Sequence, residues 1–241
     1  MTGERIAHAP DALWLPIGAK FLHVPAFSCR PADRVLLAPD VREATDDVAA
    51  SLARALTGLS PPLHGSLELF GRPLLAMPYL DTLKMRTSIG LVQGRGGLLS
   101  NRSVRDNVTL PLSVHAGLDH VQEMARVNAL LDDLELTTVA HLRPHVLDDV
   151  SRFRACVARA LVLQPRWVVV EGVGDFEPEP HGSDTWQRLL RHVELAQGAV
   201  AVCLPRPIAA FERWWLSHGG QVLRCHVHPS MPAFAPGSRV P

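Results

Sequence analysis

The strongest constraint on the fold is a regular alternation of short apolar runs with amphipathic segments of helix length. Runs of strand length are predicted at residues 34–37, 66–70, 89–93, 167–171, 199–204 and 221–225. Val168, Val169 and Val170 are apolar at consecutive positions, as in a strand whose sheet is covered on both faces. This alternation is typical of α/β proteins, in which crossover helices join parallel strands.

Three helices are predicted between these runs. The first covers residues 44–56 and ends before Gly58. The second covers residues 119–134 with Asp119 as its N-cap, and the third covers residues 151–163. The expected buried face of the second helix consists of Val121, Met124, Leu131 and Leu134.

The stretch from residue 94 to residue 163 contains no predicted strand. It therefore indicates a helical subdomain inserted into a single domain that covers residues 1–225. Residues 226–241 are rich in proline and are expected to form a flexible, extended tail.

The composition excludes several classes of protein. A chain of 241 residues with 47% hydrophobic content can bury a full core, which excludes general disorder. Its 24 basic and 24 acidic residues balance, so neither a nucleic acid nor an anionic membrane is an expected partner. No apolar run reaches the roughly 18 residues of a membrane span and no leader segment is recognised, so a cytoplasmic location is expected.

The four cysteines are scattered along the chain, with no C-x-x-C pair among them. They are Cys29, Cys156, Cys203 and Cys225. Buried free thiols are therefore expected, and neither a disulfide framework nor a zinc site of the usual spacing is predicted.

Several motifs follow one another in a fixed order. Residues 88–93 have the sequence Ser-Ile-Gly-Leu-Val-Gln. Leu-Leu-Ser-Asn follows at residues 98–101, and Ser-Val-Arg-Asp-Asn-Val follows at residues 103–108. Residues 158–165 have the sequence Ala-Arg-Ala-Leu-Val-Leu-Gln-Pro directly before the valine strand, and residues 219–222 are Gly-Gly-Gln-Val. Over residues 20–225 this order resembles the ATP-binding subunits of ABC transporters. The corresponding segments of that family are the Q-loop strand, the signature helix, the Walker B strand and a late hairpin.

The resemblance implies an α/β fold of the P-loop-NTPase, ABC ATPase type, with a mainly parallel sheet flanked by helices and an inserted helical subdomain. It also implies a dimer at the inner face of the cell membrane, in contact with a membrane subunit. The segment of Leu110, Pro111, Leu112, His115 and Leu118 is similar to the lipid-transporting Mla-type members. The resemblance places the surface that couples to the membrane subunit at Gln93, Leu98, Leu99, Leu110 and Pro111.

The phosphate-binding loop of such a domain needs glycines, a lysine and a serine or threonine. No glycine occurs between Gly18 and Gly58, and the only lysines are Lys20 and Lys84. The corresponding segment, residues 38–47, carries four acidic residues; its degenerate positions are Ala38, Asp40, Arg42 and Thr45. Two like charges about 4 Å apart repel by about 4 kcal/mol at an effective dielectric constant near 20, so a bound triphosphate is not expected.

Three further motifs lack their functional side chains. Asp148, Asp149 and Val150 occupy the positions of the signature Ser-Gly-Gly. Glu171 occupies the metal-facing aspartate position, and Gly172 replaces the catalytic glutamate that acts as the general base. Pro205 and Arg206 follow the strand where a switch histidine is expected, so only Gln93 keeps the residue of the family.

Other groups have structural explanations. Residues 94–97, Gly-Arg-Gly-Gly, lack a following lysine and are interpreted as a turn. Arg154 and Arg159 are interpreted as solvated or ion-pairing residues of a helix and not as arginine fingers. A metal at residues 225–228, Cys-His-Val-His, is the alternative to a frayed strand end there. Trp214 and Trp215 are expected to seal one end of the sheet, with a partner surface as the alternative.

The sequence therefore predicts a pseudo-ATPase that has no ATPase activity, binds no cofactor and pairs with a membrane permease or a catalytic ATPase subunit, in lipid or hydrophobic-solute transport. One alternative is a working ATPase that binds ATP and Mg²⁺, with Arg42 in place of the lysine and Glu171 as a metal ligand. The other is a soluble scaffold or regulator that has left transport.

Overall fold

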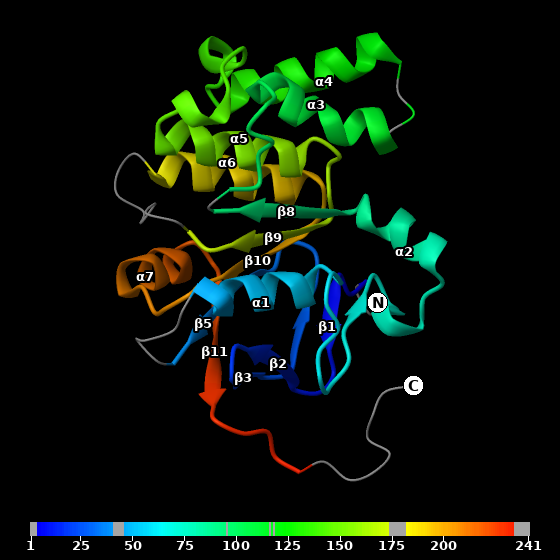
Figure 1. Cartoon of the computed structure of the whole chain (residues 1–241), viewed down its shortest axis with the longest axis vertical. Helices are drawn as coiled ribbons and strands as arrows, with labels where there is room; N and C mark the ends of the chain where they lie inside the picture. The colour runs from blue at the N-terminus through cyan, green and yellow to red at the C-terminus, as the bar shows by residue number, and fades with distance from the viewer. Residues whose placement is uncertain are drawn as a thin grey trace.

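The computed structural model describes residues 4–40, 46–94, 96–115, 117, 119–173 and 182–233. Its main feature is a seven-stranded mixed sheet of order β2-β3-β11-β5-β10-β9-β8 (Figure 1). Helices cover both faces of this sheet, which confirms the α/β class and the mainly parallel core.

Five strands form the parallel part of the sheet. They are β8 (Ile89–Gln93), β9 (Trp167–Glu171), β10 (Ala199–Cys203), β5 (Arg34–Pro39) and β11 (Gln221–His228). Gln93, Glu171 and Cys203 pair in register at the ends of three neighbouring strands. The carboxyl ends of these strands therefore form one edge, where α/β proteins commonly bind their ligands.

Antiparallel strands extend the sheet on the side of β11 and form a second, smaller sheet. β2 (Leu13–Ile17) pairs with β3 (Lys20–Val24), and β3 pairs with β11. The small sheet has the order β4 (Phe27–Cys29), β1 (Ala7–Ala9), β6 (Glu68–Leu69), β7 (Arg72–Pro73). The strand predicted at residues 66–70 shrinks to two residues, because Phe70 and Gly71 turn the chain with positive φ angles of 53° and 71°.

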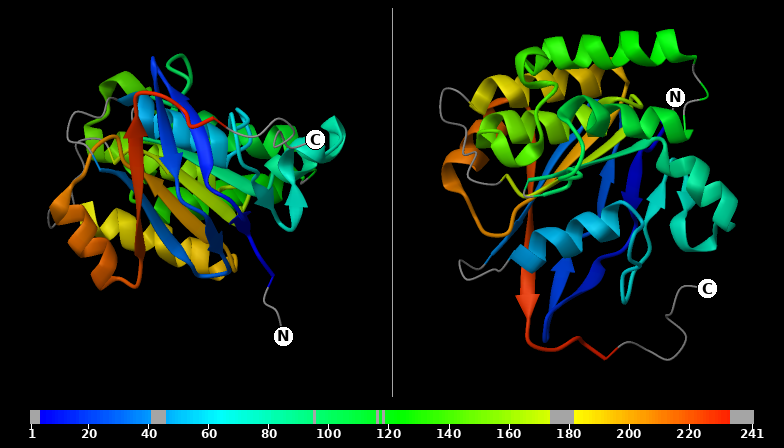
Figure 2. Two further views of the ribbon diagram at one scale, coloured as in Figure 1. Left: turned by 90° about the horizontal axis from the view of Figure 1, so that it is seen from below. Right: turned by 45° about the horizontal axis from the view of Figure 1, so that its top comes forward.

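The two faces of the sheet have separate cores because successive side chains of a strand point to opposite sides. In β5, Val35 and Leu37 pack toward α1 (Asp46–Leu56), while Leu36 and Ala38 pack toward the opposite helices. Those helices are α5 (Asp149–Leu161), α6 (Gly182–Leu195) and α7 (Ala209–Ser217). Figure 2 shows α1 and α6 on opposite sides of the strands.

The chain between β8 and β9 is helical in its described part. It contains α3 (Val104–His115), α4 (His120–Asp133) and α5, with short 3-10 turns at Thr137–Val139 and Pro144–Val146. Ahead of β8 lie a 3-10 turn at Leu74–Ala76 and α2 (Tyr79–Arg86). In Figure 1, α3 and α4 lie at the end of the molecule beyond β8.

The predicted helix boundaries are close to the observed ones. Asp119 caps α4 by accepting a hydrogen bond from the backbone N–H of Gln122 at 2.8 Å, as predicted. α5 starts two residues earlier than predicted because Asp148 is its N-cap. The first two residues of the helix predicted at 44–56 lie outside the described residues.

One predicted core position is wrong. Val121 is 77% exposed, and the buried residues of α4 are Val127, Leu130 and Leu131, followed by Leu134 after the helix. The first turn of α4 therefore carries an apolar side chain that the neighbouring helices do not cover.

The tail predicted from residue 226 is also wrong at its start. β11 continues to His228, and the pairs His226 with His23 and His228 with Phe21 join it to β3. Backbone pairing with β3 extends this strand by three residues beyond Cys225. Residues 234–241 lie outside the described chain.

Candidate functional site

Gln93 and Glu171 form a side-chain pair at the carboxyl edge of the sheet. Gln93 ends β8 and Glu171 ends β9, and the Nε2 group of Gln93 donates to Oε2 of Glu171 at 3.3 Å. Both side chains are half-buried. Parallel pairing in register thus brings together two positions that are 78 residues apart in the chain.

The loops that leave these strands are anchored to the sheet through backbone hydrogen bonds. The N–H of Gly94 donates to the carbonyl of Glu171 at 2.9 Å, and the N–H of Gly172 donates to the carbonyl of Cys203 at 2.8 Å. A Cβ at Gly94 would lie 2.8 Å from the carbonyl oxygen of Gly172. Gly172 has a φ of +72°, a conformation that disfavours side chains. The position that the family resemblance assigns to the catalytic glutamate therefore has a backbone suited to glycine.

Asp40, directly after β5, is paired with a histidine of β11. The Nδ1 group of His226 donates to Oδ2 of Asp40 at 2.7 Å, and the N–H of Val227 lies 3.4 Å from Oδ1. Burial raises the pKa of the Asp40 carboxyl, but these two hydrogen bonds outweigh it and hold the pKa below its usual value. These contacts form because β11 runs past the end of β5 and brings residues 226 and 227 to Asp40.

The start of α1 carries no phosphate-binding groups in its described part. Val48 and Ala49 are buried, Asp47 is exposed, and the hydroxyl of Ser51 donates to the carbonyl of Pro16 at 2.7 Å. Ala38 is buried in the core. Arg42 and Thr45 lie outside the described residues.

The lysines lie on other elements: Lys20 is in β3 and Lys84 is in α2. No lysine follows β5 before α1 ends. The described residues at the end of β5 and the start of α1 therefore do not fit a triphosphate with Mg²⁺.

The aspartates at the signature position serve α5. Asp148 accepts from the backbone N–H of Ser151 at 2.7 Å and from its hydroxyl at 3.1 Å, which makes it the N-cap. Asp149 pairs with Arg152 at 2.7 Å, and Val150 is half-buried. These carboxylates thus contact the backbone and side chains of the first turn of α5. The family resemblance places groups that bind a partner's nucleotide at these positions.

Pro205 and Arg206 follow β10. The N–H of Leu204 still donates to the carbonyl of Leu37 at 2.9 Å, so the chain stays on the sheet up to that residue. Pro205 is half-buried and Arg206 is exposed. Neither can replace a switch histidine as a hydrogen-bond acceptor through its side chain.

Asn107 is a structural residue of the site that the sequence analysis did not single out. It is fully buried, and its Oδ1 accepts from the N–H of Leu99 at 2.7 Å. Its Nδ2 group lies 3.1, 3.3 and 2.9 Å from the carbonyls of Leu99, Arg102 and Ser103. One side chain thus fixes the segment between β8 and α3; a buried asparagine in an otherwise apolar stretch is the signal that could have identified it.

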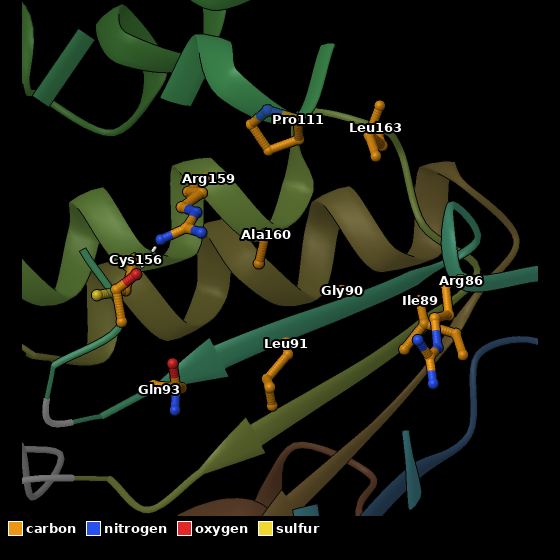
Figure 3. A pocket seen from close by; sticks show the side chains of 11 residues that line it. Arg86, Ile89, Gly90, Leu91, Gln93, Pro111, Cys156, Arg159, Ala160 and Leu163 are labelled. Carbon is orange, nitrogen blue, oxygen red and sulfur yellow. Dashed lines mark hydrogen bonds between the residues drawn. The ribbon is translucent and has the colours of Figure 1, made fainter. Parts of the chain in front are cut away.

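A groove of about 260 Å³ lies between β8, α5 and α3 (Figure 3). Of the predicted coupling residues, Gln93 and Pro111 line it. Leu98 packs against the core, Leu99 is 39% exposed and Leu110 is half-buried; these three do not line the groove. Two arginines, Arg86 and Arg159, line it as well, and the sequence analysis assigned neither of them to a binding surface.

Several structural interpretations of the sequence are confirmed. The guanidinium of Arg154 lies 2.7 Å from Glu135 and 3.7 Å from Asp184. Gly96 and Gly97 have φ angles of +86° and +81°, as a turn requires. Arg95 lies outside the described residues.

The aromatic residues of α7 form a cluster against α6. Phe211 and Trp215 are buried with Trp186, whose ring centre is 5.1 Å from that of Phe211. Trp214 is half-buried beside them. The expected packing role of this segment is confirmed.

All four cysteines are buried and free. Burial raises the pKa of the Cys29 and Cys225 thiols to about 12. Within the described ranges, no three histidine, cysteine or acidic side chains are arranged to hold a metal ion. No helix in the described part of the chain is long and apolar enough to cross a membrane.

The chain is similar in sequence to curated ATP-binding proteins. The chain is 30% identical over 156 residues to the methionine import ATP-binding protein MetN of Nocardia farcinica, covering 64% of this chain and 46% of that protein. It is 32% identical over 131 residues to MetN 1 of Acinetobacter baylyi, covering 54% and 36% of the two chains. The chain thus spans less than half the length of these curated relatives. No family model matches the chain.

Solved structures share the fold. The dimeric structure of MJ0796, a bacterial ABC transporter cassette, matches with a TM-score of 0.69 and 16% identity over 91% of this chain and 94% of that one. CbiO1 of Clostridium perfringens, part of the ABC transporter complex cbiONQ, matches with a TM-score of 0.67 and 17% identity over 92% and 87%.

The chain therefore has the P-loop-NTPase fold of the ABC ATPases. Part of its sequence is similar to the MetN ATP-binding proteins.

Proposed function

We propose that this chain is a catalytically inactive ATP-binding-type subunit of an ABC transporter. The observation that carries the proposal is Gly172, which directly follows Glu171 at the carboxyl edge of the sheet. The Gln93–Glu171 pair is formed in register at this edge, and residue 172, which follows it, carries no carboxylate. Without a base to orient the attacking water, hydrolysis loses a large part of its catalysis.

The retained groups support a role in assembly. Asn107 anchors the segment before α3, Asp148 caps α5, and Gln93 pairs with Glu171 beside the groove, so these polar side chains support the folded structure. Groups that would bind phosphate are replaced at the end of β5, in the first turn of α5 and after β10. This separation favours a subunit that keeps its docking surface while a partner supplies the ATP chemistry.

The proposed partners are a membrane permease and a catalytic ATPase subunit, with this chain at the inner face of the membrane in a homodimer or heterodimer. The MetN relatives are named as methionine import proteins. A lipid or hydrophobic solute is proposed on the similarity of residues 110–118 to Mla-type proteins alone.

A working ATPase with an altered site is the second candidate. It is favoured by the proximity of Gln93 and Glu171, because amide and carboxylate oxygens are ligands that Mg²⁺ accepts. In that case Arg42 would contact phosphate in place of the lysine. A scaffold without any transporter partner is the third candidate and predicts that variants of the groove have no effect on a membrane complex.

Thermal unfolding with and without saturating Mg-ATP separates the first two candidates. A ligand at about 100 times its dissociation constant stabilises the native state by about 2.7 kcal/mol, a rise in Tm of roughly 5 to 10 °C for a chain of this size. An inactive subunit that does not bind nucleotide shows no shift, and a catalytically active ABC ATPase domain in the same buffer serves as the positive control. A shift together with release of phosphate would establish the altered ATPase.

A further inference from the structure

We propose that the join between β3 and β11 is a proton-sensitive clasp. In mildly acidic solution, protonation of its histidines opens the pairing of residues 226–228 with β3, while Asp40 keeps its contact with His226. The inference goes beyond the proposed function and does not depend on it. It rests on a short ladder, on three imidazole rings that share one face of that ladder, and on the position of the carboxylate beside them.

The antiparallel hairpin of β2 and β3 is joined to the parallel strands through a short ladder. Three residue pairs form this ladder: His23 with His226, Leu22 with Val227, and Phe21 with His228. On its other side β11 pairs with β5 up to Cys225, so residues 226–228 have β3 as their strand partner (Figure 1). A short ladder at the end of a strand opens locally at a lower free-energy cost than the core strands.

Three imidazole rings lie on one face of this ladder. His23 and His226 are directly opposite each other, and their ring centres are 6.1 Å apart. The ring of His228 is 6.0 Å from that of His23. The indole of Trp14, from β2, lies 4.9 Å from the ring of His23 and 5.1 Å from that of His228. Like charges at such cross-strand and diagonal positions oppose the pairing of the strands.

The counter-charge at the clasp serves one of the three rings. Asp40, at the end of β5, accepts a hydrogen bond from Nδ1 of His226 at 2.7 Å. Within the described ranges this is the ion pair that the three histidines form. A proton on His23 or His228 therefore adds a positive charge without a counter-charge about 6 Å from another imidazole.

Other titratable groups near the clasp are engaged elsewhere. Arg224 shares the face of His226 on β11, and it donates to Glu212 of α7 at 2.8 Å. Lys20 is exposed at the start of β3 and is three residues from His23, so it points to the opposite face. His64 lies beside β2, where its carbonyl accepts from the N–H of Trp14 at 3.0 Å.

The direction of the pH effect follows from these surroundings. Burial is the larger cause that lowers the pKa of His23, and the charges of His226 and His228 add to it. When the ladder opens, the ring is exposed and leaves β11, so its pKa returns toward about 6.5 and the open form binds the proton more tightly. The closed ladder is therefore complete above that pH and loses stability below it.

Asp40 directs the opening to the side of β3. Burial raises the pKa of its carboxyl, but the hydrogen bonds from His226 and Val227 outweigh burial and hold the pKa below its usual value. Asp40 therefore stays ionised in mildly acidic solution, where a protonated His226 binds it more strongly. The end of β11 stays with β5 while its pairing with β3 is lost.

A cavity of about 590 Å³ over the rings gives water access to them. It is lined by Trp14, the three histidines, Ser230, Met231 and Pro232. Protons thus reach the imidazoles in the folded chain. Because residues 230–232 complete the lining, opening of the ladder also changes the surface that follows β11.

Hydrogen exchange of the full chain, followed by mass spectrometry at pH 7.5 and pH 5.5, tests the proposal. Exchange in each peptide is expressed relative to its intrinsic rate at the same pH, so that a change reports opening. A proton taken up only by the open form predicts that protection of residues 21–23 and 226–228 falls about fivefold to tenfold between these pH values. Protection of β9, at residues 167–171, should change by less than about threefold over the same interval.

His23→Gln removes the titrating group at the centre of the cluster and should reduce the fall to less than about twofold. His120→Gln is the matched control, because it removes an exposed histidine of α4 and should keep the fall of the wild type. Asp40→Asn removes the counter-charge of His226, so the fall should become steeper than in the wild type. Melting temperatures at pH 7.5 show that each variant is folded.

Protection that is independent of pH in the wild type, or that falls equally in β9, would overturn the inference. So would a fall in His23→Gln as large as that in the wild type. If His23→Gln does not fold, His228→Gln takes its place, since its ring is 6.0 Å from that of His23, and a fall that matches the wild type there would also overturn the inference.

Discussion

Replacing Asn107 by alanine tests whether one buried side chain holds the segment between β8 and α3. The amide makes one contact as an acceptor and lies within hydrogen-bond distance of three carbonyls, which its two N–H groups share. We count about three effective hydrogen bonds of about 1 kcal/mol each, so the expected loss in free energy of unfolding is about 3 kcal/mol. For a chain of this length that loss corresponds to a fall in Tm of roughly 6 to 12 °C.

The assay is urea denaturation at pH 7, followed by circular dichroism and by tryptophan fluorescence. Asn101→Ala is the matched control, because Asn101 is an exposed asparagine of the same segment, and it should change the free energy by less than about 0.5 kcal/mol. Asn107→Asp has nearly the same shape but places a carboxylate oxygen against the carbonyls, so it should destabilise at least as strongly as alanine.

Amide hydrogen exchange then locates the effect. The N–H of Leu99, which donates to Asn107 at 2.7 Å, should lose protection in Asn107→Ala more than the amides of β9. A change below about 0.5 kcal/mol in Asn107→Ala with an unchanged m-value would refute the argument that this side chain organises the segment.

Three other changes follow from the same structure. Burial is the main cause that lowers the pKa of His23, and the charges of His226 and His228 lower it further. Below the unfolded pKa of about 6.5, the unfolded chain therefore binds more protons at His23 than the folded chain does. This contribution to stability should be complete above that pH and should fall as the pH drops below it. His23→Gln should flatten this part of the pH profile of the urea midpoint, whereas His120→Gln, at an exposed position, should leave it unchanged. Gly94→Ala should cost about 1–3 kcal/mol because the new Cβ meets a carbonyl oxygen at 2.8 Å, and a loss below about 0.5 kcal/mol would contradict the close contact. Gly96→Ala, which meets nothing within 4 Å, should cost only the roughly 1–2 kcal/mol of its positive φ. Burial raises the pKa of the Cys156 thiol to about 11, and the other three thiols are buried as well; none should react with Ellman's reagent at pH 8 before urea is added, and rapid labelling of the native protein would refute their burial.

The predicted strands at residues 89–93 and 167–171 coincide with β8 and β9. β9 is buried on both faces, so its apolar character is continuous, whereas β8 at the edge of the sheet alternates half-buried and buried positions; a polar residue marks the end of each strand. The four strands before Arg34 were not predicted, because they are three to five residues long and are stabilised by partners elsewhere in the chain. Val121 was misplaced because a helical period shows which residues share a face but not how far along the helix its neighbours reach.

The sequence by itself determined the α/β class and the order of the motifs, because these depend only on residue type and local spacing. Tertiary structure alone decided which distant groups meet. Parallel pairing joined Gln93 to Glu171, and the extension of β11 beyond Cys225 gave Asp40 the partner His226. It also placed Arg86, before β8, and Arg159, in α5, on one groove. Such contacts depend on strand order and register, which local periodicity does not encode.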